Sequence, residues 1–265
     1  MLSVESMKSD ISVAIKYFDL YYFLAKQDLK SRFRRSYLGI SWIVIQQLFF
    51  SLVAGYIWSR IFGMKASEFI PFLTIGSVLW TFISAAMIEG CGTFVIAHNY
   101  LKQLPLPQSI FIFRTLFTSL FYLAVGLCTI IGILIIFDKF NILSIFYMLP
   151  GIIILVCYFY GISGSFAYLG LRYRDLQHAI TSILALLFIV TPVLYPPELL
   201  IKKGIAIVVY MNPLASLIEL IRYPLLNNDF AHINHYLISI VFVLALMLLK
   251  FVLKRKWERF VPFWA

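Results

Sequence analysis

Six long apolar stretches, each free of Asp, Glu, Lys and Arg, constrain this chain more than any other feature of its sequence. They cover residues 38–58, 69–88, 115–137, 142–171, 180–195 and 233–249. A helix needs about 20 apolar residues to cross the hydrocarbon core of a bilayer, which is about 30 Å thick. The pattern therefore predicts an all-α membrane protein with six transmembrane helices.

Lys and Arg are distributed unevenly between the connections that join these stretches. When alternate connections are assigned to opposite sides, sixteen of the 22 Lys and Arg residues fall on one side and six on the other. Basic residues concentrate on the cytoplasmic side of a membrane protein, so both termini are expected in the cytoplasm. The net charge of +10 then indicates topology and contact with anionic membrane lipids, and not a nucleic-acid groove.

Residues 1–37 form a segment distinct from the membrane domain, which we place at 38–265. Apolar residues recur in it at spacings of three and four, at Ile11, Ile15, Phe18, Tyr22, Ala25, Leu29 and Phe33. This periodicity predicts an amphipathic helix that lies in the cytoplasmic interface of the membrane. The alternative is a solvated basic tail.

The last external connection, residues 196–232, is unusually apolar. Its two apolar pieces, residues 199–210 and 214–226, are too short to span and are separated by Asn212-Pro213. Segments of this length are typical of re-entrant or interfacial helices. We expect two short helices that act as an external gate, with Pro196, Pro197, Asn212 and Pro213 at their breaks. The alternative is a helical hairpin that only covers the spans.

The sequence offers little chemistry of its own. None of its thirteen glycines is followed by Lys, so the chain has no phosphate-binding loop of the type that ATPases use. The three cysteines, Cys91, Cys128 and Cys157, form no C-x-x-C pair, and no metal site is indicated. The spans contain no carboxylate for ion coupling. We assign no catalytic residue, and any energy for transport must come from another chain.

Four short motifs resemble those of a known family. Residues 28–42 read DLKSRFRRSYLGISW, and YRDL, TPVLYP and NPL follow at residues 173–176, 191–196 and 212–214. In this order they resemble the Wzm-like permease subunits of ABC exporters for O-antigen, capsule and teichoic acid. The chain departs from the family at Gln27, where Arg is usual, within residues 99–103, and near Gln47, where Pro is usual.

The resemblance implies a homodimer bound to two nucleotide-binding ATPase subunits, which would hold ATP and Mg²⁺, while this chain holds no cofactor. It implies a polyprenyl-pyrophosphate-linked glycan as substrate and the bacterial cytoplasmic (inner) membrane as location. It also implies that the first, second and fifth spans line the path. Two other classes stay open: a membrane-embedded enzyme that acts on polyprenyl-linked glycans, and an ABC permease for a drug or small lipid.

We assign candidate roles to four further groups of residues. The lipid pyrophosphate is expected at Arg32, Arg34, Arg35 and Tyr37, although a basic anchor before the first span is the simpler interpretation. The glycan path is expected to use Trp42, Phe49, Phe50, Tyr56, Trp80, Phe82, Phe188 and Tyr195, whose alternative role is core packing. Coupling to the ATPase is assigned to Glu89, His98, Asn99, Tyr100 and Lys102, and the fourth connection contributes Arg172, Arg174 and Asp175.

Overall fold

The computed structural model describes residues 10, 12–34, 36–104, 106–202, 204 and 211–264, without the side chains of residues 201–202. Within these ranges the chain is helical and contains no strand. Each long apolar stretch lies largely within one helix. These helices are α3 (Ser41–Ile61), α4 (Ala66–Ile96), α6 (Ser109–Ile136), α7 (Ile142–Arg172), α8 (Leu176–Val190) and α12 (Ile233–Trp257).

Five of these six helices are long and apolar enough to cross a membrane. The exception is α8, which is apolar but has only 15 residues. At about 1.5 Å a residue it is about 22 Å long, which is less than the hydrocarbon thickness. The chain is therefore a multi-pass helical membrane protein, and a sixth crossing at α8 stays a prediction.

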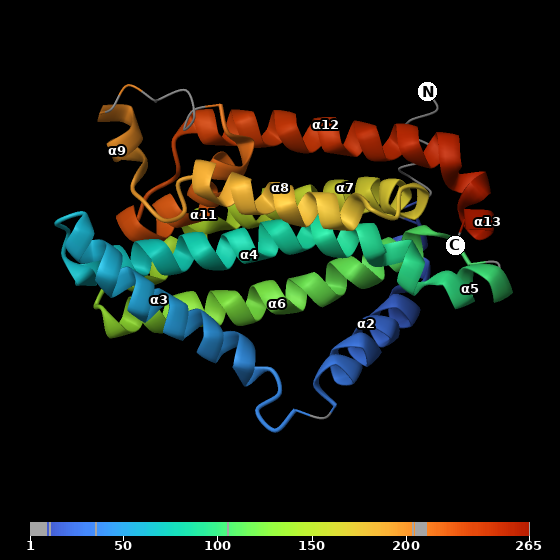
Figure 1. The fold of residues 1–265 in the computed structure, drawn as a ribbon, viewed down its shortest axis with the longest axis horizontal. Helices are drawn as coiled ribbons and strands as arrows, with labels where there is room; N and C mark the ends of the chain where they lie inside the picture. The colour runs from blue at the N-terminus through green and yellow to red at the C-terminus, as the bar shows by residue number, and fades with distance from the viewer. Residues whose placement is uncertain are drawn as a thin grey trace.

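Helix α4 is the centre of the bundle. It contacts α3, α6, α7, α8 and the buried helix α11 (Pro213–Asn227). In Figure 1, α8 is drawn above α4 and α3 runs obliquely below it, while α12 runs along the upper edge of the molecule. Very close approach of α4 and α7 depends on glycine, because a Cβ at Gly170 would lie 2.5 Å from the carbonyl oxygen of Cys91.

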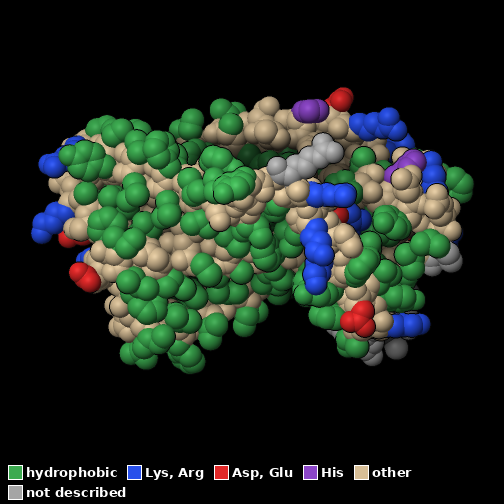
Figure 2. Space-filling model, turned by 90° about the horizontal axis from the view of Figure 1, so that it is seen from below, with side chains coloured by type: hydrophobic (Ala, Val, Ile, Leu, Met, Phe, Trp, Pro, Cys, Tyr) green, Lys and Arg blue, Asp and Glu red, His purple; other side chains and the backbone are tan. Residues whose placement is uncertain are grey.

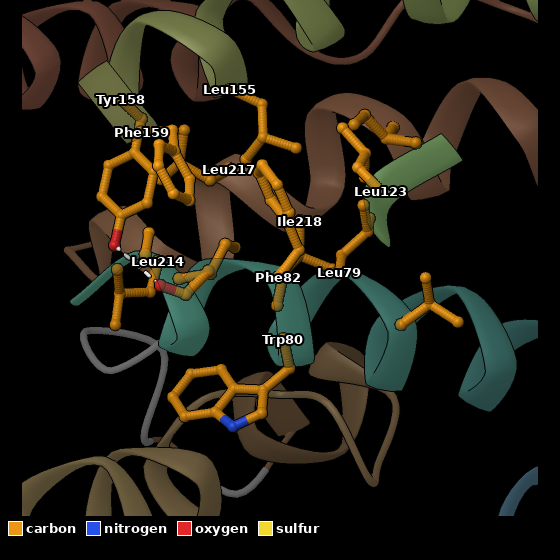
Figure 3. Close-up of a cluster of buried hydrophobic side chains, with 14 of the residues drawn as sticks. Leu79, Trp80, Phe82, Leu123, Leu155, Tyr158, Phe159, Leu214, Leu217 and Ile218 are labelled. Carbon is orange, nitrogen blue, oxygen red and sulfur yellow. Dashed lines mark hydrogen bonds between the residues drawn. The ribbon is translucent and has the colours of Figure 1, made fainter. Parts of the chain in front are cut away.

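The main core lies where α4, α6, α7 and α11 meet (Figure 3). Leu155 and Tyr158 of α7 are fully buried there, and the Tyr158 hydroxyl donates to the carbonyl of Ile83 at 3.3 Å. Figure 3 shows Trp80 on the opposite side of α4 from these residues. It packs there against Phe188 of α8, with ring centroids 5.5 Å apart.

The external connection begins with the short helix α9 (Pro197–Lys202) and continues to α11. The predicted piece at residues 199–210 lies largely outside the described residues. The second predicted piece corresponds to α11, whose Leu217, Ile218, Leu220 and Ile221 are completely buried. The Asn212 side chain caps its N-terminus by accepting from the backbone of Leu214, and Pro213 follows at the first position.

The opposite end of the molecule carries α2 (Phe18–Phe33), α5 (His98–Gln103) and α13 (Val261–Trp264) (Figure 1). The short helix α5 lies in the second connection, and α4 reaches Ile96, beyond the apolar stretch at residues 69–88. Figure 2 shows the molecule from below. Hydrophobic side chains cover much of its left half, a few charged side chains lie at the left edge, and several Lys and Arg side chains lie in the right half.

Candidate functional site

The N-terminal helix α2 is fixed to the bundle by a specific ion pair. Arg114 of α6 donates two hydrogen bonds to Asp28, at 2.6 Å from Nε and 2.5 Å from Nη2. Tyr21 and Leu24 are buried against the bundle on the same helix, while Ile15 and Tyr22 of the predicted apolar stripe stay exposed. One face of the N-terminal segment therefore packs on the bundle, and part of the predicted apolar stripe is exposed.

Arg32, at the C-terminal end of α2, reaches across to α4. Its Nη1 lies 3.3 Å from Oε1 of Glu89, whose second oxygen accepts a hydrogen bond from Ser119 at 3.0 Å. The guanidinium also lies over the ring of Tyr122, 5.3 Å from its centroid. Burial alone would lower the pKa of Arg32. The attraction of the neighbouring Glu89 carboxylate is larger than this effect, so the pKa of Arg32 lies above its usual value.

Behind this pair lies a cavity of about 360 Å³ between α3, α4 and α6. Arg32 and Glu89 are at one end, and Gly126 and Thr129 are at the other. The wall between them is mostly apolar, and it includes Ile43, Val78, Phe82, Ala85 and Leu123. In Figure 1, α2 and α3 form the two arms of a V whose apex is the connection between them, below the bundle. This cavity joins Arg32 and Glu89, which the sequence had assigned to different roles.

The other basic candidates are placed differently. Arg34 and Tyr37 are exposed, and neither lines this cavity. Arg35 lies outside the described residues. Among the described members of the expected phosphate-binding group, only Arg32 lines this cavity.

The candidate path aromatics separate into two groups. Trp42, Phe49 and Tyr56 are more than half exposed, and Phe50 is 39% exposed, all on α3. Trp80 and Phe82 of α4 are buried, with 8% and 5% of their surfaces exposed. The Tyr195 hydroxyl donates to the carbonyls of Ile189 and Val190, so it stabilises the end of α8. Among these candidates, an open aromatic surface is therefore found on α3.

Two of the candidate coupling residues, His98 and Asn99, share a pocket at the end that carries α5 and α13, whereas Glu89 lies in the cavity beside Arg32. His98 and Asn99 line a pocket of about 570 Å³ together with Arg174 and Trp264. Arg172 lies over the Trp264 ring, 4.7 Å from its centroid. Tyr100, Lys102 and Asp175 are exposed nearby in the chain and do not line this pocket. The second connection, the fourth connection and the C-terminal helix thus form one surface.

At the external end, two polar contacts connect α11 to the turn after α8. Asn212 donates to the Thr191 hydroxyl at 3.0 Å, and Arg222 donates to the Pro192 carbonyl at 2.9 Å. Arg222 is only 1% exposed and also pairs with Glu219. Pro196 and Pro197 line an outer pocket beside Arg222, whereas Asn212 and Pro213 begin α11.

Two important groups were not identified from the sequence. Arg222 was counted only as an external cation, although Glu219 three residues earlier was a signal for a paired, buried site. Asp10 accepts hydrogen bonds from Tyr160, Lys250 and Lys254 at 2.7–3.0 Å, and also from Ser109. No local pattern marks this cluster, because its partners lie from 99 to 244 residues away.

Burial alone would raise the pKa of the Asp10 carboxyl, because a charged group loses its hydration. Lys250, Lys254 and the hydrogen bond from Ser109 outweigh this effect and hold the pKa well below its usual range. Asp10 is therefore ionised at physiological pH, and it neutralises part of the buried positive charge on α12.

The five long apolar helices define a multi-pass membrane protein. The profile of the ABC-2 type transporter family matches residues 19–226. The chain belongs to this ABC-2 type transporter family, as a Wzm-like permease, and it is a transport component and not an enzyme.

Two curated proteins show the similarity along most of the chain. The O-antigen export system permease protein RfbA of Klebsiella pneumoniae is 26% identical over 244 residues, which cover 90% of this chain and 93% of that protein. The protein of the same name from Myxococcus xanthus is 23% identical over 197 residues, which cover 73% and 75% of the two chains.

Proposed function

We propose that this chain is the membrane subunit of an ATP-driven ABC transporter that exports a lipid-linked polysaccharide, O-antigen or a similar polymer, across the bacterial cytoplasmic membrane. The observation that carries the proposal is the match, over nine-tenths of the chain, to a permease protein of an O-antigen export system. The chain has no phosphate-binding loop, so ATP and Mg²⁺ belong to a partner ATPase.

The geometry supports different roles for the two ends of the molecule and for α3 between them. The pocket formed by His98, Asn99, Arg174 and Trp264 suits the docking of the ATPase, because it joins two connections at the basic end. Both termini then lie in the cytoplasm, as the distribution of Lys and Arg predicts. The exposed aromatic face of α3 would line the polymer path in a homodimer, and α11 with the turn after α8 would form the external gate.

An aromatic, charge-poor wall fits a long polymer better than a tight polar pocket does. Sugar rings present C–H faces that pack on aromatic rings, and Trp42, Phe49 and Tyr56 offer such rings along one exposed helix. No carboxylate or lysine lies on α3, so the wall would bind each sugar weakly and let the chain advance.

The proposal is tested by deleting the gene and restoring it with variants. We expect the deletion to remove the surface polysaccharide and the wild-type chain to restore it. The double variant Arg32→Ala, Arg35→Ala should insert in the membrane and bind the ATPase, but export should fall about tenfold or more, because a charged hydrogen-bond donor to phosphate is lost. The readout is the amount of surface polysaccharide per cell.

The matched control is Arg60→Ala, which removes a cation at the opposite end of α3. This variant should export normally. A deletion strain with unchanged surface polysaccharide would contradict the proposed function, whatever the behaviour of the point variants.

A further inference from the structure

Arg222 of α11 is a buried cation at the external end of the molecule, with 1% of its surface exposed. Its Nη1 donates to the Pro192 carbonyl at 2.9 Å, its Nε donates to Glu219 at 3.1 Å, and its Nη2 donates to the same carboxylate. The guanidinium also lies over the Phe72 ring of α4, 4.1 Å from its centroid. One buried side chain therefore joins α11, α4 and the turn that follows α8.

The turn after α8, residues 191–196, fits closely against α4 beside this cation. A Cβ at Gly76 would lie 3.2 Å from Nη1 of Arg222 and 3.2 Å from the carbonyl oxygen of Val193. Val193 itself is completely buried in the main core. Because Gly76 has no side chain, the guanidinium and the turn can meet on the surface of α4.

The two elements that Arg222 joins are packed very differently. Most residues of α11 are buried, whereas Leu184 is the one buried residue of α8. In the described part of the chain, two hydrogen bonds join the turn to α11: the bond from Arg222 to Pro192 and the bond from Asn212 to Thr191. A loosely packed helix is therefore held at its external end by directional contacts to a firmly packed one, and such contacts separate two discrete positions.

The outer pocket gives this contact a way to break. Arg222 and Glu219 line the pocket, which has a volume of about 570 Å³ and opens to solvent beside the exposed Lys139 and Glu198. A buried charge that loses a partner is costly unless another group replaces that partner. If the Pro192 carbonyl moved away, water from the pocket would replace it at Nη1, and Glu219 would keep the guanidinium paired.

We propose that Arg222 is the positioning residue that holds the external gate closed, through its hydrogen bond to the Pro192 carbonyl. In the closed state, this bond and the bond from Asn212 to Thr191 fix the turn after α8 on α11. Opening breaks both bonds and moves the external end of α8 away, while Arg222 stays on α11 with Glu219. The inference rests on the proposed function, in which α11 and the turn after α8 form the gate.

The first experiment measures leak through the resting transporter. The full-length chain and its ATPase are reconstituted in liposomes without ATP, and the efflux of carboxyfluorescein is recorded. Arg222→Lys keeps a positive charge beside Glu219, but one ammonium group cannot reproduce the fork that also reaches the Pro192 carbonyl. We expect efflux to rise about tenfold, as the loss of one hydrogen bond from a charged group predicts. Gly76→Ala should raise it by a smaller factor, because its Cβ displaces the turn without removing a donor or acceptor.

Lys139→Gln is the matched control, because Lys139 is an exposed cation of the same pocket. Its efflux should equal that of the wild type. Wild-type efflux from Arg222→Lys would overturn the assignment of Arg222. An equal rise in Lys139→Gln would overturn it as well, since the effect would then come from the charge of the pocket.

The second experiment fixes the gate in its closed state. Thr191→Cys with Asn212→Cys places two thiols where the native side chains lie 3.0 Å apart, within reach of a disulfide, in a background with Cys91, Cys128 and Cys157 replaced by Ala. After oxidation, export of surface polysaccharide should fall about tenfold or more, and a reductant should restore it. A misfolded protein would not recover in this way.

Unchanged export with the disulfide formed would show that the turn and α11 need not separate, and it would overturn the proposal. Failure of the disulfide to form under oxidising conditions would overturn the contact on which the proposal is built. Neither result contradicts the proposed function, which is decided by the deletion strain.

Discussion

The carboxylate of Asp10 is shared by four donors on three helices: Ser109 on α6, Tyr160 on α7, and Lys250 and Lys254 on α12. Asp10, Ser109, Lys250 and Lys254 are buried and Tyr160 is partly buried, and the Lys250 ammonium also lies over the Tyr160 ring at 3.5 Å. Two lysines face one carboxylate, so the cluster keeps a positive excess even when it is intact. Removal of Asp10 would leave two neighbouring buried cations without a counter-ion.

We expect Asp10→Asn to destabilise the protein by about 3–5 kcal/mol, the usual cost of breaking a buried ion pair on one side. Thermal unfolding of the detergent-solubilised protein is the measurement. The double variant Asp10→Asn, Lys254→Gln should recover part of the loss, because one uncompensated cation is removed as well. Asp19→Asn is the control, since Asp19 is exposed on α2. Equal effects of Asp10→Asn and Asp19→Asn would contradict a buried role for Asp10.

The pH dependence of this cluster follows from the lowered pKa of Asp10. A carboxyl whose folded pKa is depressed contributes stability that is fully present above its unfolded pKa, about 3.9 for Asp. That contribution is lost as the pH falls through the folded pKa. Melting temperatures of the wild type and Asp10→Asn should therefore differ by the same amount at pH 7 and pH 5. A difference that shrinks markedly by pH 5 would show that Asp10 titrates in the ordinary range.

At the scale of helices, glycine sets how closely α4 and α7 approach. A Cβ at Gly170 would lie 2.5–2.9 Å from three backbone atoms of Cys91, which cannot move aside as a side chain would. Gly170→Ala should therefore cost about 1–3 kcal/mol through overpacking. Gly132→Ala on α6 is the matched control, because nothing lies within 4 Å of its Cβ position. Melting temperatures should fall for the first variant and stay level or rise for the second.

The same scale shows what the sequence could predict. Long apolar stretches located the membrane helices, and Asn212-Pro213 marked the start of α11, because a cap and an N-terminal proline act locally. The second apolar stretch ends before Glu89, but the helix that contains it does not, and where the span itself ends stays a prediction. The Glu89 carboxylate pairs with Arg32 and accepts a hydrogen bond from Ser119. Because its charge is satisfied in this way, α4 continues past it to Ile96.

The candidate site was less predictable than the helices. Arg32 and Glu89 were both selected from the sequence, but their pairing across 57 residues was not, because a charge does not specify its partner. Asp10 and Arg222 were not selected at all. Their importance arises from burial, which depends on how helices far apart in the chain pack, and no local pattern encodes that.

For the whole molecule, α3 and α8 are the apolar helices around α4 that bury the fewest of their residues. Leu184 is the one buried residue of α8, and α3 buries only Ser51, Gly55 and Ser59. The polymer path proposed along α3 accounts for its exposure, whereas α8 is about 22 Å long and has His178, Thr181 and Ser182 exposed in its first turns. Polar groups and exposed helix ends at membrane depth need protein or water around them. The face that contains α8 therefore suits a second protomer better than lipid.

Cysteine cross-linking in membranes tests this orientation of the homodimer. Leu186 on α8 and Val241 on α12 are both 66% exposed, so they form a matched pair that differs only in the face they occupy. In a background with Cys91, Cys128 and Cys157 replaced by Ala, we expect Leu186→Cys to give a covalent dimer with a short bismaleimide. Val241→Cys should stay monomeric, because two-fold symmetry brings like residues together only near the axis. A covalent dimer with Val241→Cys alone would place the partner on α12 and leave α8 to the lipid.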